Sequence, residues 1–282
     1  THAFYQCRPE TLAKVEQDPV FQKATNLSSK ELQTAKVCAA MCEDLDTAIG
    51  QVLKKMDDLG IAKNTYVVFT SDNGYKAWNA GNEPLRGGKW WLWEGGIRVP
   101  MIVRGPDVPA GTRCNVNVVN YDFLPTFADL AGATSHMPKE VDGASFKALL
   151  FGQPVADSYV TRPLFFHYPH YRVAPPASAL IAGQQKLLHY YEWPDKEWLY
   201  NLNDDLGETN NLAAAQPERA AQMAKQLANQ IKSVGGYFPK PNPNADPHAV
   251  IYDPCNLSNR GDSHDPELGI NEERTTPKRN RK

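Results

Sequence analysis

The sequence has no apolar run that approaches the roughly 18 residues a membrane-spanning helix needs. It has no positively charged start followed by an apolar stretch, but it begins at Thr1 rather than Met, so this says nothing about export. It also lacks an excess of charge of one sign, because its formal net charge is −2 and basic residues gather only at the last few positions. We therefore expect no membrane span and no nucleic-acid partner.

Cysteine is also scarce. The five cysteines are scattered and odd in number, which is not the dense pattern of a disulfide scaffold. Cys38 and Cys42 lie one helical turn apart in an apolar stripe and are predicted to be small buried hydrophobic residues. The number and spacing of the cysteines therefore indicate neither an oxidising nor a reducing compartment.

The composition is that of a globular protein. The 282 residues are 41% hydrophobic and 22% charged, enough to bury a sizeable core. The opening residues 1–4 read as the end of a segment already under way. We therefore expect the chain to be the carboxyl-terminal part of a longer protein.

The first part of the chain, residues 1–153, predicts an α/β fold with a mostly parallel sheet sandwiched by helices. Apolar residues at three- and four-residue spacing predict a helix over 28–59, and a β-branched and aromatic run predicts a buried strand over 66–70. A long functional loop is expected over 71–94, a second strand over 98–103 and a helix over 121–131.

From residue 154 the pattern changes to short aromatic runs separated by turns. These predict a small antiparallel sheet with strands at 164–168, 178–182, 186–191 and 198–202. A helix over 217–233 is expected to cover one face, with its apolar side formed by Ala221, Ala224, Leu227, Ala228 and Ile231. We expect this subdomain to end near 235 and residues 236–282 to form an extended or disordered tail.

A carboxylate and an amide follow the first predicted strand. Asp72 and Asn73 stand at its carboxyl end, where open α/β sheets bind their ligands. Two adjacent oxygen donors suit a hard cation such as Ca²⁺. On these residues alone, an ordinary Asp-Asn-Gly turn is an equal alternative.

Two glycine pairs flank a single lysine a little further on. Gly87-Gly88 and Gly95-Gly96 permit close backbone approach or positive φ, and Lys89 between them is a pre-positioned cation for an anionic substrate. The alternative is that Lys89 is a solvated surface charge, as most lysines are.

These segments resemble the sulfatases of the alkaline phosphatase-like superfamily in order and spacing, over roughly residues 30 to 235. The matching segments are 71–74 (SDNG), 85–89 (LRGGK), 94–100 (EGGIRVP), 122–126 (DFLPT), 141–143 (VDG) and 199–212 (LYNLNDDLGETNNL). The resemblance implies an incomplete alkaline phosphatase-like fold and the hydrolysis of sulfate esters.

The resemblance also implies roles for individual residues. Asp72 and Asn73 would bind Ca²⁺, and Lys89 would contact the sulfate group. Asn73 favours a sulfatase over the related phosphatases and phosphonate hydrolases, which tend to carry His there. His2 matches a histidine that protonates the leaving alcohol in the family, although the Pro expected two residues later is Phe4 here. A terminal histidine without a role is the alternative.

Cys7 begins a segment that matches only the first three positions of the family's nucleophile motif. That nucleophile is a formylglycine made from the cysteine of a Cys-x-Pro-Ser-Arg motif, and Cys7-Arg8-Pro9 is followed by Glu10-Thr11 instead. Cys7 also follows His2, whereas the family motif comes far earlier. We therefore expect the nucleophile, and the paired aspartates that complete the metal site, to lie in an amino-terminal part that precedes this chain.

His167 and His170, each beside a tyrosine, resemble a histidine-rich stretch at the substrate-pocket rim of some sulfatases. They could read a sugar by stacking and hydrogen bonding; surface histidines on an edge strand are the equal alternative.

The predicted function is thus a Ca²⁺-dependent sulfatase acting on a sulfated carbohydrate or an aryl sulfate, with this chain inactive by itself. A phosphomonoesterase or phosphonate hydrolase of the same superfamily and a non-catalytic protein that binds sulfated glycans remain alternatives. By analogy with the family, we expect the protein to be exported to the periplasm, the exterior or the lysosome.

Overall fold

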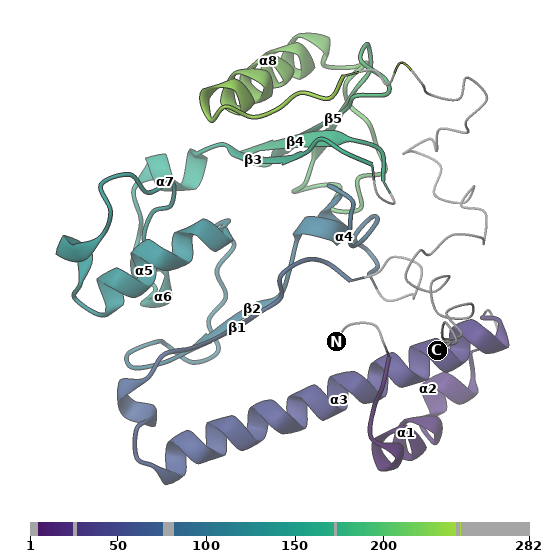
Figure 1. The fold of residues 1–282 in the computed structure, drawn as a ribbon, viewed down its shortest axis with the longest axis vertical. Helices are drawn as coiled ribbons and strands as arrows, with labels where there is room; N and C mark the ends of the chain where they lie inside the picture. The colour runs from purple at the N-terminus through teal and green to yellow at the C-terminus, as the bar shows by residue number, and fades with distance from the viewer. Residues whose placement is uncertain (1–4, 25–26, 76–81, 172–173, 241–242, 244–282) are drawn as a thin grey trace, which may run out of the picture.

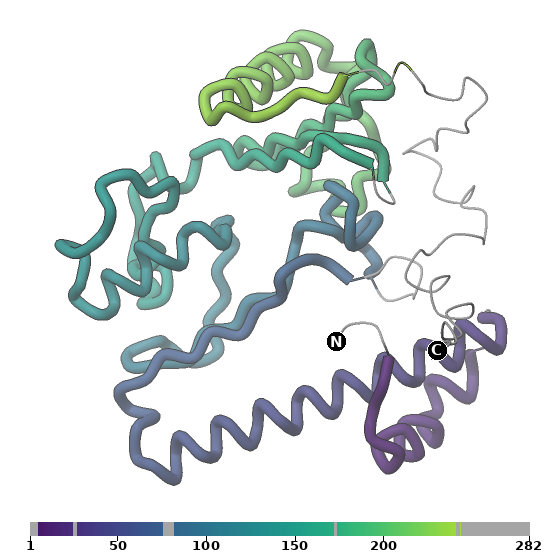
Figure 2. The backbone as a smooth tube through the Cα atoms, viewed as in Figure 1, coloured from purple at the N-terminus to yellow at the C-terminus, as the bar shows by residue number. Residues whose placement is uncertain are grey.

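The computed structural model describes residues 5–24, 27–75, 82–171, 174–240 and 243. Figures 1 and 2 show a long helix along one side, a ribbon of strands rising from its end, and a second sheet with a covering helix on the far side; the ribbon has two strands and the second sheet has four. None of the described helices is long and apolar enough to cross a membrane.

The long helix is α3 (Ser29–Asp58), which confirms the helix predicted over 28–59. It begins with a capping box, in which Ser28 accepts from the backbone N–H of Glu31 and the Glu31 carboxylate accepts from that of Ser28. Two short helices, α1 (Pro9–Glu16) and α2 (Pro19–Gln22), precede it. α1 is attached to α3 because Asp44 accepts hydrogen bonds from Arg8 and Thr11.

The two-stranded sheet pairs β1 (Val67–Thr70) with β2 (Met101–Arg104). A 3-10 helix (Ala62–Asn64) leads from α3 into β1. The two strands are antiparallel, so a parallel neighbour of β1 is not found among the described residues. All four residues of β1 are half-buried rather than covered on both faces as predicted.

A group of short helices follows β2. They are the 3-10 helix Asn120–Asp122, α5 (Phe123–Leu130), the 3-10 helix Thr134–His136, α6 (Lys147–Leu150) and α7 (Asp157–Thr161). Asp122 is fully buried and joins them by accepting from the backbone N–H groups of Val119 and Ala144, from the Tyr159 hydroxyl, and from both terminal nitrogens of Arg162. The helix expected over 121–131 is confirmed as the pair of elements around Asp122.

The second sheet has the order β3-β4-β5-β6 and is antiparallel throughout. Its strands are β3 (Leu164–Tyr168), β4 (Ala177–Ala182), β5 (Gln185–Tyr190) and β6 (Glu197–Asn201), close to the predicted ranges. One face packs against α8 (Pro217–Ser233), which lies across the sheet in Figure 1. The opposite face packs on Trp91 and Trp93 of the loop between β1 and β2.

The buried side of α8 is turned slightly from the predicted one. Leu227 and Ile231 are buried as expected, but Ala220 and Met223 fill the core where Ala221 was predicted, and Ala221 is exposed. The prediction counted alanines and overlooked Met223, whose larger side chain gains more from burial.

The start of the predicted tail packs against this subdomain. Phe238 lies against the core under α8, and the Tyr237 carbonyl oxygen is 2.7 Å from Nε2 of His167. Tyr237 and Phe238 therefore contact the folded subdomain, and residues 236–240 form neither a helix nor a strand. The rest of the predicted tail, apart from residue 243, lies outside the described residues.

Candidate active site

The loop between β1 and β2 carries most of the predicted site residues. Thr70 pairs with Met101, so residues 71–100 leave the sheet and return to it at one point. The Ser71 hydroxyl donates to the Asn73 carbonyl oxygen at 2.9 Å and shapes the turn after β1. Asp72 on this turn is exposed and Asn73 is half-buried.

Four glycines allow the backbone of this loop to pack against itself. The Gly74 N–H donates to the Gly96 carbonyl oxygen at 2.9 Å. A Cβ atom on Gly74 would lie 1.7 Å from the Gly95 oxygen, and one on Gly96 would lie 2.0 Å from the Trp91 oxygen. Gly87 has a left-handed φ of 69°. Gly87 thus takes the positive φ that the prediction allowed, and close approach of the glycine pairs to a ligand stays a prediction.

The side-chain amide of Asn82 donates hydrogen bonds to backbone oxygens in three parts of the loop. Its Nδ2 lies 3.2 Å from the Tyr75 oxygen, 2.9 Å from the Gly87 oxygen and 3.1 Å from the Gly95 oxygen. We did not identify this residue from the sequence. Its acceptors are backbone atoms, which leave no pattern in the residue types.

Lys89 lies at the centre of residues 82–96, called the glycine loop below. Its backbone N–H donates to the Tyr75 oxygen at 2.9 Å, which joins the glycine loop to the turn that carries Asp72 and Asn73. Its Nζ is 5.5 Å from the centre of the Trp90 ring. Trp90 has a φ of 76°, a strained value for an aromatic residue, and such strain gathers at functional sites.

Tyr75 ties this site to the long helix. Burial, together with a hydrogen bond to the Cys38 thiol, raises the pKa of its phenol, so the group stays protonated at neutral pH. Cys38 is buried as predicted, but Cys42 is exposed, so the prediction for that residue was wrong. At Cys42 the stripe of α3 is not covered by another described element, whereas at Cys38 the site loop covers it.

A buried group of charges lies beneath the glycine loop. Lys186 of β5 is fully buried, with its Nζ 3.0 Å from the Glu94 carboxylate and 2.8 Å from the Glu208 carboxylate. Arg98 also donates to Glu94 at 2.6 Å. Burial favours the neutral acid, but Lys186 and Arg98 outweigh it at Glu94 and hold its pKa below the ordinary value. At Glu208 burial prevails over Lys186, and the pKa is raised.

The donor types at the end of β1 fit a calcium ion, because a carboxylate and an amide oxygen are ligands that Ca²⁺ takes. Among the described residues, however, no group of three or more His, Cys, Asp or Glu side chains could hold a metal. Asp72 and Asn73 would therefore be part of a larger ligand set.

Of the three histidines predicted to have a role, the structure describes His167 and His170. His2 lies outside the described residues. His167 is half-buried on edge strand β3, where Nδ1 is 2.7 Å from the Ser178 hydroxyl and Nε2 is 2.7 Å from the Tyr237 oxygen. His170 is exposed, with its ring centre 4.1 Å from that of Tyr168. Because both ring nitrogens of His167 have protein partners, His170 is the better candidate to meet a sugar.

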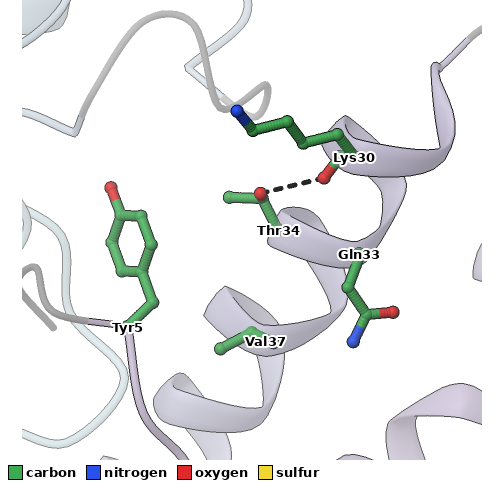
Figure 3. A pocket seen from close by; sticks show the side chains of 5 residues that line it. All are labelled: Tyr5, Lys30, Gln33, Thr34 and Val37. Atoms are coloured by element: carbon green, nitrogen blue, oxygen red, sulfur yellow. Dashed lines mark hydrogen bonds between the residues drawn. The ribbon is translucent and has the colours of Figure 1, made fainter. Parts of the chain in front are cut away.

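Two further features lie apart from the glycine loop. Burial and the nearby Asp44 raise the pKa of the Cys7 thiol, and the rejection of Cys7 as nucleophile stays a prediction from its motif. Figure 3 shows a hollow between Tyr5 and α3. The residues that line it are Tyr5, Lys30, Gln33, Thr34 and Val37, and no predicted site residue is among them.

Comparison with known proteins identifies the family of this chain. Residues 1–133 match the family model described as "Sulfatase", and residues 88–235 match "N-sulphoglucosamine sulphohydrolase, C-terminal". The chain belongs to the sulfatase family. The sequence of a protein named "Sulfatase" from Formosa agariphila is 37% identical over 215 residues, which are 69% of this chain and 38% of that protein.

Solved sulfatase structures share the fold. The structure of Ps i-CgsB in complex with k-i-k-neocarrahexaose superposes with a TM-score of 0.66 at 27% identity, covering 81% of this chain and 47% of that one. The structure of BT4656 in complex with D-glucosamine-2-N,6-O-disulfate gives a TM-score of 0.63 at 25% identity, covering 77% and 45%. These neighbours confirm the predicted alkaline phosphatase-like α/β fold, and the chain spans less than half the length of each of them.

Proposed function

We propose that this sulfatase chain supplies one side of a Ca²⁺-dependent active site that hydrolyses sulfate esters. The observation that carries the proposal is the hydrogen bond from the Lys89 N–H to the Tyr75 oxygen. It joins the only lysine of the glycine loop to the turn that bears Asp72 and Asn73. A cation and two oxygen ligands for a metal are thus held on one rigid backbone cluster.

Each residue has a distinct role in this proposal. Asp72 and Asn73 would hold Ca²⁺, which when bound supplies a Lewis acid for the sulfate oxygens. The Lys89 ammonium would neutralise charge that builds on the sulfuryl and leaving oxygens, a contribution often worth about 3 kcal/mol. His2 would protonate the departing alcohol. The nucleophile, a formylglycine, and the remaining ligands would come from polypeptide outside this chain, so we propose that the chain alone is inactive.

The proposed substrate is a sulfated carbohydrate. Support comes from the family model named for N-sulphoglucosamine sulphohydrolase and from the neighbour solved with D-glucosamine-2-N,6-O-disulfate. His170 on the surface beside β3 is a candidate contact for such a sugar. Export to the periplasm, the exterior or the lysosome remains part of the proposal by analogy with the family.

Two alternative functions make different predictions about the residues of the site. A phosphate or phosphonate esterase of the same superfamily is disfavoured by Asn73, since its amide is a hard oxygen donor rather than an imidazole. A protein that only binds sulfated glycans would keep Lys89 and the turn that bears Asp72 and Asn73, and would lack the nucleophile.

The test uses the full-length protein with Lys89→Ala and, as a matched control, Lys225→Ala on the exposed face of α8. Hydrolysis of a sulfated glucosamine and of the corresponding phosphate ester is measured. We expect Lys89→Ala to lower kcat for the sulfate ester by about 10²- to 10³-fold and Lys225→Ala to change nothing. Faster hydrolysis of the phosphate ester, or binding without turnover in the unmodified protein, would favour the corresponding alternative.

A further inference from the structure

Glu208 follows β6 in the carboxyl-terminal subdomain, far in sequence from the site, and has two unusual properties. Its side chain is fully buried, and its φ is 52°. A non-glycine residue in the left-handed region is costly, and a buried carboxylate is costlier still unless it is paired. Both features call for a reason in what Glu208 contacts.

Glu208 holds both ends of the segment that carries Lys89. Its backbone carbonyl oxygen accepts from Nη1 of Arg86 at 2.7 Å, three residues before Lys89. Its side-chain Oε2 accepts from the backbone N–H of Glu94 at 2.6 Å, five residues after Lys89. One residue of the second subdomain therefore fixes both the entry and the exit of the turn that bears Lys89.

The contact is reinforced from three sides. The Arg86 guanidinium lies 4.1 Å from the centre of the Trp93 ring and so closes the turn across its base. Lys186 pairs with both Glu94 and Glu208, and Arg98 also pairs with Glu94, so two cations offset the two buried carboxylates. A Cβ on Gly207 would lie 3.1 Å from the Pro84 oxygen, so the chain before Glu208 also lies directly against the glycine loop.

The left-handed backbone explains how one residue reaches two partners. In this conformation the carbonyl oxygen and the side chain of Glu208 are presented to different parts of the same loop. The carboxylate of Asp205 caps the turn around it by accepting from the backbone N–H groups of Thr209 and Asn210 at 2.9 and 2.8 Å. The strained conformation is thus maintained by its surroundings, as at other functional positions.

We propose that Glu208 is a positioning residue for Lys89: the carboxyl-terminal subdomain clamps the glycine loop through Glu208 and Lys186, and so sets the place of the Lys89 ammonium. The proposal rests on the proposed role of Lys89 in sulfate ester hydrolysis. It gives the second subdomain a part in the reaction without any contact to the reacting atoms. Misplacement of such a group by about 1 Å costs about 10²-fold in rate.

The test compares Glu208→Gln with Glu197→Gln in the full-length protein. Glu197 is a matched control because it lies on β6 of the same sheet and pairs with His189, away from the glycine loop. Glu208→Asp is the second variant: it keeps the charge and suits a left-handed φ, but its shorter carboxylate does not reach the Glu94 N–H. It replaces Glu208→Gln if that protein fails to fold.

Two measurements decide the outcome. Hydrogen exchange should speed up in residues 86–96 of the Glu208 variants, with β3–β6 unchanged, and Glu197→Gln should leave residues 86–96 as in the parent. In steady-state kinetics, we expect kcat of the Glu208 variants to fall by about 10- to 100-fold with KM little changed. In a Lys89→Ala background the same substitutions should cost less than about twofold, because a positioning residue acts only through the group it positions.

Each contrary result has a separate meaning. Unchanged exchange in residues 86–96 would overturn the clamp itself. If the fold-loss of kcat in a double variant equals the product of the losses in the two single variants, Glu208 acts independently of Lys89. That result would overturn its positioning role. Full activity in Lys89→Ala would overturn the proposed function of that lysine, while the exchange measurement would still report whether Glu208 holds the loop.

Discussion

At the scale of single residues, the fold depends on charged groups that have left water. Asp122 is fully buried and accepts hydrogen bonds from two backbone N–H groups, a phenol and a guanidinium. Burial alone would raise the pKa of Asp122, but these donors outweigh it, and the pKa lies below its ordinary value. The carboxylate thus organises the helices that follow β2.

Asp122→Asn should destabilise the protein by about 3 to 5 kcal/mol, because it leaves the mostly buried Arg162 without its counter-charge. The matched control is Asp129→Asn, whose pair with Lys147 is about one-third exposed and should be worth less than about 1 kcal/mol. Urea unfolding at pH 7 measures both. Equal effects of the two variants would contradict the central role of Asp122.

The same carboxylate predicts a dependence on acid. Because the folded pKa of Asp122 is lowered, its contribution is fully present above the unfolded pKa near 3.8 and is lost as pH falls through the folded value. We expect stability to decline below about pH 4 and the Asp122→Asn variant to decline less steeply. Thermal unfolding between pH 2.5 and 6 measures this, and parallel curves for the two proteins would contradict it.

Gly95 and Gly50 make a second matched pair. A Cβ on Gly95 would lie 2.4 Å from the Arg86 oxygen and 2.6 Å from the Gly87 oxygen, so Gly95→Ala should cost about 1 to 3 kcal/mol or more and disturb the glycine loop. Gly50 lies in α3 with no atom within 4 Å of a Cβ, so Gly50→Ala should stabilise by up to about 1 kcal/mol. Differential scanning calorimetry of both variants should show shifts of opposite sign.

Sequence reasoning selected single residues only where the signal was local. Asp72, Asn73 and Lys89 stand in short motifs, and their roles stay predictions. Glu208 and Lys186 were missed because their partner Glu94 is 114 and 92 residues away, and neither segment alone shows that a charge will be buried.

At the scale of elements, periodicity predicted the helices and strands that bury one face. α3, α5, α8 and the four strands of the second sheet lie close to their predicted ranges. The direction of β2 relative to β1 was not predictable, because a short apolar run carries no information on its partner. The short helices α1, α2, α4 (Glu94–Ile97), α6 and α7 span eight residues or fewer, too short for a helical period to stand out.

Met223 gives a test of the interface between α8 and the sheet. It is fully buried among Leu180, Leu187 and Leu199, so Met223→Ala should cost about 2 to 5 kcal/mol through the cavity it leaves. Gln226→Ala on the exposed side of the same helix should change stability by less than about 0.5 kcal/mol. Chemical unfolding of both variants measures the difference, and similar midpoints would show that α8 contributes little to the core.

At the scale of the whole molecule, the glycine loop and the second sheet are joined by the contacts of Glu208 and Lys186 with Glu94. The full-length protein should lose sulfatase activity with a calcium chelator and regain it with Ca²⁺ more readily than with Mg²⁺, since an amide and a carboxylate suit the larger ion. Asp72→Asn should weaken Ca²⁺ binding in calorimetry. Undiminished affinity in that variant would remove Asp72 from the ligand set.

The pairing of Thr70 with Met101 has a consequence for engineering. Because residues 71–100 leave and rejoin the sheet at adjacent positions, they form a module that is covalently attached at one place. Exchange of this module between related sulfatases would keep both strands intact. The contacts of Glu208 and Lys186 with Glu94 show that it has a second, non-covalent attachment. A working chimera would therefore need the module and its receptor in the second sheet to come from the same parent.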